Sequence, residues 1–144
     1  ESTQKRVNPE AATRIRAANA EEAVLGMVLL HPEYFKTLSA VLSPEDMVTP
    51  FNKALYTLLT ERQKEGKEIE LTYLSEVYDN DEMAYLTKMV KDARERVSAL
   101  TADEIKRYAE IIRYENRLSV LNRPSELTPE QIKEQLDTMK QMKK

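Results

Sequence analysis

The longest stretch without a polar side chain is the run Ala23–Leu30. It is too short to cross a bilayer, which takes about 20 apolar residues. Ala20, Ala23, Val24, Met27 and Val28 share one face at helical spacing, and the leucines between them face elsewhere. A helix that is apolar nearly all round is buried. We therefore expect a central helix around which the other helices pack.

The ends of this central helix are marked by local signals. Asn19 with Glu22 three residues later approximates a capping box, and His31 precedes Pro32, which disfavours continuation of the helix. Gly26 in the middle costs roughly 1 kcal/mol relative to alanine, so we expect a neighbouring helix to approach closely there. The central helix is thus predicted over Asn19–Pro32.

Helical spacing also predicts the elements on both sides. We expect a short helix over Pro9–Ala18, one that begins at Pro32, a turn from Ser43 through Met47, and a helix from Thr49–Pro50 to the stop at Gly66 with Phe51, Ala54, Leu55, Leu58 and Leu59 on its buried face. Leu71–Tyr78 is interpreted as a helix, with a strand over Glu68–Tyr73 as the alternative. Asp79–Asp81 is a predicted turn before a further helix that carries Met83 to Val97.

A long helix follows, opened by a capping box at Thr101 and ending near Asn122 before Pro124. Its apolar face changes side along its length. Ile105, Tyr108, Ala109 and Ile112 share one side, whereas Tyr114, Leu118 and Leu121 point nearly the opposite way. We expect the first half to pack on the core and the second half to project.

The last helix is expected to cover that projecting half. Thr128–Gln131 forms another capping box, and Leu127 can pack on Ile132 as a hydrophobic staple. Because the connection is short, the two helices should form an antiparallel hairpin, mobile until it docks. The predicted fold is all-α: residues 1–8 a linker or an expression remnant, 9–112 a helical bundle, and 113–144 a protruding C-terminal hairpin that shares the long helix 102–122.

Composition and charge narrow the function. The chain has 144 residues, 22 basic and 25 acidic, and neither cysteine nor tryptophan. It begins at Glu1 without an initiator Met, so we expect a part of a longer protein. Without cysteine there is no disulfide framework and no thiolate metal site. A mildly acidic surface favours docking on a protein over a dedicated nucleic-acid interface, which is usually basic.

No residue pattern indicates catalysis, a cofactor or a metal. His31 is the only histidine, Glu21–Glu22 fit the negative charge favoured at a helix N-terminus, and Asp79–Glu82 lacks the glycine of a calcium loop. Lys88, Lys91, Arg94 and Arg96 are interpreted as a solvated face. Met139 and Met142 on the thin final helix either pack within the hairpin or form an adaptable docking surface.

Two stretches, Ala20–Phe35 and Met47–Leu59, resemble a family: the helical domain shared by the C-terminus of bacterial DNA primase (DnaG) and the N-terminus of the replicative DNA helicase. Its first helix follows an "E-x-x-L-L-x-x-L-L-x-x-P" pattern, which Glu21, Val24, Leu25, Val28, Leu29 and Pro32 fit. Leu55 and Tyr56 match the end of a second motif, whereas Met47 and Asn52 stand where Phe and His are common.

The end of the chain, a long helix followed by a hairpin, favours the primase member. The resemblance then implies a non-catalytic, cytoplasmic domain of a nucleotidyltransferase, without cofactor or metal, monomeric alone, that binds and stimulates the replicative helicase through the helicase's N-terminal domain. The implied partner-binding residues are Tyr114, Arg117, Leu118, Leu121, Ile132, Leu136, Met139, Lys140, Met142 and Lys143. The alternative is the N-terminal oligomerisation domain of the helicase itself. A small helical enzyme or nucleic-acid binder is the third hypothesis.

Overall fold

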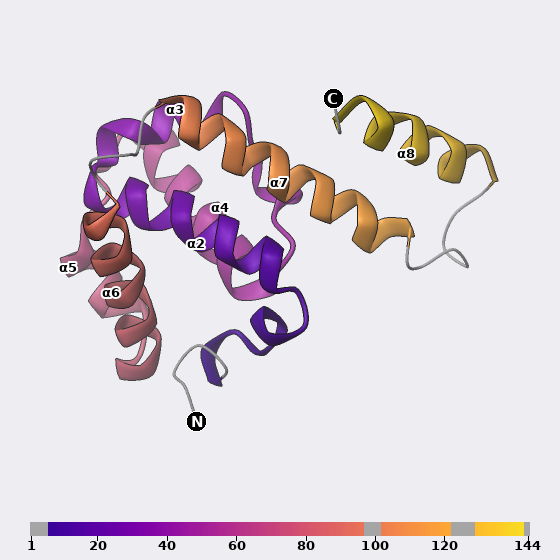
Figure 1. Cartoon of the computed structure of the whole chain (residues 1–144). Helices are drawn as coiled ribbons and strands as arrows, with labels where there is room; N and C mark the ends of the chain where they lie inside the picture. The colour runs from indigo at the N-terminus through magenta and orange to yellow at the C-terminus, as the bar shows by residue number, and fades with distance from the viewer. Residues whose placement is uncertain (1–5, 97–101, 122–128, 143–144) are drawn as a thin grey trace.

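The computed structural model describes residues 6–96, 102–121 and 129–142, and every regular element in these ranges is helical. The longest apolar run forms α2 (Ile15–Leu30), which lies between α6 (Asn80–Glu95) and α7 (Ala102–Leu121) and contacts both (Figure 1). The all-α class and the central position of this helix are confirmed. Within the described ranges, none of the helices has the length and apolarity that a membrane span needs.

The start of α2 differs from the prediction. The helix begins at Ile15 rather than Asn19, and the expected helix Pro9–Ala18 is only a 3₁₀ turn, η1 (Pro9–Ala12). Ala17 and Ala18 are fully buried, so packing extends the helix backward past Asn19, whose polar side chain is exposed. The end of α2 is as expected, because His31 leaves the helical region before Pro32.

Shorter elements connect α2 to the rest of the bundle: η2 (Pro32–Tyr34), α3 (Phe35–Ser39), η3 (Pro44–Asp46), α4 (Pro50–Lys64) and α5 (Leu71–Val77). The turn predicted from Ser43 is present and opens with a capping box, in which Asp46 accepts a hydrogen bond from the Ser43 backbone N–H at 2.9 Å. Gly66 has a φ of 73°, which suits its place just after α4. The alternative strand over Glu68–Tyr73 is wrong, because α5 begins within it.

The buried face of α4 is rotated from the predicted one. Asn52, Leu55, Tyr56 and Leu59 are buried, whereas Ala54 is exposed. Apolar periodicity missed this face because two of its members are polar. The Tyr56 hydroxyl donates a hydrogen bond of 2.5 Å to the Leu42 carbonyl oxygen, which satisfies it inside the protein.

Gly26 lies where α2 and α6 approach each other, as expected. A Cβ atom at this position would stand 2.4 Å from the carbonyl oxygen of Met89 and 3.3 Å from Cβ of Ala93. Both neighbours belong to α6, which an Asp79–Glu82 capping box opens. The absence of a side chain at Gly26 therefore sets the spacing of the two helices.

The long helix α7 extends past the bundle, and α8 (Pro129–Met142) packs against it and runs back along its second half (Figure 1). On α7, Ile105, Ala109 and Ile112 are buried as predicted, and Tyr108 is half-buried. The predicted signals at Val97, Thr101, Leu127 and Thr128 lie outside the described residues. The hairpin arrangement itself agrees with the expectation from sequence.

Candidate interaction surface

The pair formed by α8 and the second half of α7, here called the hairpin, presents mostly half-buried and exposed side chains. Tyr114, Arg117, Leu118 and Leu121 on α7 are all half-buried. Because α8 covers one side of this segment only, these side chains are neither core nor fully solvated. They are the α7 residues that the sequence assigned to partner binding.

On α8 the predicted partner-binding residues differ in their exposure to solvent. Met139 is 8% exposed, whereas Leu136 is 45% exposed and Lys140 is fully on the surface. Met139 does not belong to the main core cluster, so its burial comes from the hairpin. The structure therefore favours packing within the hairpin for Met139, and it leaves Leu136 as an apolar side chain in contact with solvent. The side chains of Ile132 and Met142, and all of Lys143, lie outside the described residues.

Three hydrogen bonds between residues that sequence reasoning did not select attach the hairpin to the bundle. The Arg14 guanidinium donates to the backbone carbonyl oxygen of Glu115 at 3.0 Å and to the Ser119 hydroxyl. The Asn116 side chain donates to the carbonyl oxygen of Glu45 at 3.3 Å. The second half of α7 is thus held to the bundle by polar contacts from the residue before α2 and from η3. No apolar periodicity signals contacts of this kind.

The bundle behind this surface contains a buried carboxylate. Glu21 is fully buried on α2 and accepts hydrogen bonds from the Val48 N–H at 2.5 Å, the Thr49 hydroxyl at 2.6 Å and the Asn52 amide at 3.2 Å. Thr49 is the N-cap of α4, so Glu21 places negative charge at the N-terminus of that helix, where it is favourable. Burial raises the pKa of Glu21 more than these hydrogen bonds lower it.

This geometry corrects the interpretation of Glu21–Glu22 as residues at the N-terminus of their own helix. Glu21 lies inside α2 and acts on α4 instead. Its neighbour Glu22 accepts a hydrogen bond from the Tyr85 hydroxyl at 2.7 Å. Asn8, which the sequence placed in a linker, is buried in the same network and donates to Thr49 Oγ1 at 3.0 Å. Both acidic side chains are engaged in holding helices together.

The side chains that the described residues expose were compared with those that a metal site or a docking surface needs. Within them no group of histidine, cysteine, aspartate or glutamate side chains is arranged to hold a metal ion. In the part of the chain that the structure describes, the large apolar side chains that are exposed to solvent are Ile15, Leu71, Val77 and Leu136. Of these, Leu136 is on α8, the helix that packs against α7.

Comparison with known proteins identifies the bundle. The family described as "DnaB-like helicase N terminal domain" matches residues 14–114, which include α2 through the first half of α7. No curated protein and no solved structure gave a significant match. The matched segment ends just before Glu115, the residue at which Arg14 holds α7, so most of the hairpin lies beyond it. Since the match spans well over half of the 144 residues, the chain belongs to the DnaB-like helicase N-terminal domain family.

Proposed function

We propose that this chain is a non-catalytic interaction domain of the bacterial DNA replication machinery, and that its hairpin docks on the N-terminal domain of a replicative helicase. The observation that carries the proposal is the exposed Leu136 on α8, the helix that packs against α7, on which Tyr114, Leu118 and Leu121 are half-buried. Leu136 and these three α7 residues would form the apolar centre of the interface. Lys140, one turn further along α8, would orient the partner through charge.

This docking can take two forms, which differ in the longer protein that the chain comes from. The family match directly favours the homotypic form, in which the chain is the N-terminal domain of a helicase and its partner is a second copy. In that form the domain oligomerises, and the hairpin surface is buried within the helicase assembly.

The heterotypic form is the second candidate. In it the chain is the helicase-binding domain of a primase, and it attaches the primase to the helicase in the primosome of the cytoplasm. The resemblance of the end of the chain to the primase member favours this form. The family match supports it only through the fold that the two proteins share.

Light scattering after size exclusion separates the two forms. The chain is measured alone and after mixing with a bacterial replicative helicase. A dimer or larger ring of the chain alone, unchanged by added helicase, supports the homotypic form. A monomer that co-elutes with the helicase supports the heterotypic form. A monomer that does not co-elute with helicases from several bacterial lineages, including closely related lineages, contradicts the docking proposal in both forms.

A further inference from the structure

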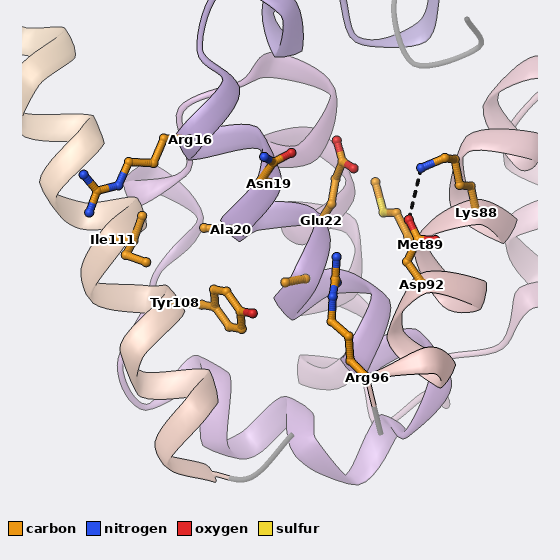
Figure 2. A pocket seen from close by; sticks show the side chains of 11 residues that line it. Arg16, Asn19, Ala20, Glu22, Lys88, Met89, Asp92, Arg96, Tyr108 and Ile111 are labelled. Carbon is orange, nitrogen blue, oxygen red and sulfur yellow. Dashed lines mark hydrogen bonds and ion pairs between the residues drawn. The ribbon is translucent and has the colours of Figure 1, made fainter. Parts of the chain in front are cut away.

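A separate pocket lies in the bundle, between α2, α6 and α7 (Figure 2). It has a volume of about 480 Å³, which falls within the range of small-molecule sites, roughly 300–1,000 Å³. The small side chains of Ala20 and Ala23 leave the space on the α2 side, and Met89, Tyr108 and Ile111 supply apolar walls from the other two helices. None of the residues assigned to the hairpin surface lines it.

Among the charged side chains around this pocket, the acidic ones have hydrogen-bond partners in the described residues, whereas two of the cationic ones do not. Three cationic side chains, Arg16, Lys88 and Arg96, and two acidic ones, Glu22 and Asp92, line it, on a chain whose net charge is −3. Asp92 accepts a hydrogen bond from Lys88 at 3.1 Å, and Glu22 accepts one from a tyrosine hydroxyl at 2.7 Å. The two guanidinium groups, by contrast, form no hydrogen bond or ion pair within the described residues.

The free donors come from different helices. In Figure 2 the guanidinium of Arg96, from the end of α6, and the hydroxyl of Tyr108, from α7, both reach into the space between these helices. Asn19 lies at the edge of the pocket on α2, and Arg16 lies at its rim beside Ile111. Neither the Tyr108 hydroxyl nor the Asn19 amide has a hydrogen-bond partner among the described residues. Such donors fit an anion with several oxygen atoms.

We propose that this pocket binds a small phosphate-bearing ligand of nucleotide size. Arg96 and the Tyr108 hydroxyl hold the phosphate, because a guanidinium matches two phosphate oxygens at once. The apolar walls from Met89 and Ile111 contact the rest of the ligand. This site is independent of the hairpin and of the partner proposed for it.

The test uses backbone amide NMR spectra of the whole chain, titrated with ADP and with inorganic pyrophosphate at constant ionic strength. We expect saturable chemical-shift changes at the pocket segments of α2, α6 and α7. ADP should bind more tightly than pyrophosphate, because it also contacts the apolar walls. Arg96→Gln should weaken binding by about tenfold or more, the cost of a lost charged hydrogen bond. Arg94→Gln is the matched control, since Arg94 is exposed on α6 but does not line the pocket.

Three results would overturn the proposal. The first is the absence of saturable chemical-shift changes at concentrations of ADP or pyrophosphate up to about 10 mM. This concentration is far above the dissociation constant expected of a specific site. The second is equal weakening by Arg94→Gln, which indicates a diffuse charge effect. The third is saturable binding of a hexaglutamate peptide without binding of ADP or pyrophosphate, which would assign the pocket to an acidic protein segment instead.

Discussion

The guanidinium of Arg14, just before α2, donates a hydrogen bond of 3.0 Å to the backbone carbonyl oxygen of Glu115 on α7. A second bond from the same group reaches the Ser119 hydroxyl, one helical turn further along. One side chain thus spans a full turn of α7 at the point where this helix leaves the bundle. Since the family match ends at residue 114, just before Glu115, Arg14 lies at the boundary between the shared domain and the hairpin.

Replacing Arg14 should loosen the hairpin without unfolding the bundle. We expect Arg14→Ala to cost about 1–2 kcal/mol, because it removes two partly exposed charged hydrogen bonds. Hydrogen exchange should then accelerate by about fivefold or more in α7 beyond Glu115, while α2 and α6 keep their protection. Arg16→Ala is the control, because Arg16 makes no such bond within the described residues. Equal exchange in the two variants would show that Arg14 does not position the hairpin.

Gly26→Ala tests the approach of α2 to α6. The added Cβ would meet the Met89 carbonyl oxygen at 2.4 Å, and backbone cannot move aside as a flexible side chain can. We expect a loss of about 1–3 kcal/mol from overpacking, despite a gain of up to about 1 kcal/mol in helix propensity. Urea unfolding measures the difference.

A second variant locates the cause of that loss. Because the closest obstacle is backbone, adding Ala93→Gly to Gly26→Ala should not restore stability. Full recovery in the double variant would instead assign the clash to the Ala93 methyl group.

Glu21 should make stability depend on pH. Since burial raises its pKa in the folded state, the folded protein holds a proton that the unfolded chain has already released between the two pKa values. The contribution of Glu21 to stability therefore decreases as the pH rises from about 4.5 through its folded pKa. Urea unfolding across pH 4–8, compared with Glu21→Gln, measures this. A wild-type stability that rises relative to the variant over this range would contradict the sign.

Apolar periodicity predicted most of the scaffold because most of its helices are held by apolar faces. The central helix, the close approach at Gly26 and the pairing of α7 with α8 follow from spacing and breaker residues alone. The start of α2 was missed because burial of small alanines extends the helix past a polar residue that looks like a cap.

The contacts that sequence analysis did not predict are polar contacts between segments that lie far apart in the chain. Glu21 contacts residues around Thr49, and Arg14 contacts residues around Glu115. The partners lie too far apart in the sequence for the spacing of a helix or a strand to indicate the contact. Glu21 therefore has a structural role at the N-terminus of α4, which its position on α2 alone does not indicate. For the hairpin, the sequence could not separate Met139, which is buried, from Leu136, which is exposed.

The most direct test of the account is the affinity of Leu136→Asp for the N-terminal domain of a replicative helicase, or for a second copy of this chain if it self-associates. Leu136 is 45% exposed, so the change should leave the thermal unfolding of the bundle intact. Leu71→Asp is the matched control, because Leu71 is an exposed leucine on α5, away from the hairpin (Figure 1). We expect Leu136→Asp to weaken binding by more than about tenfold and Leu71→Asp to leave it unchanged. Equal binding by both variants would contradict docking through the hairpin.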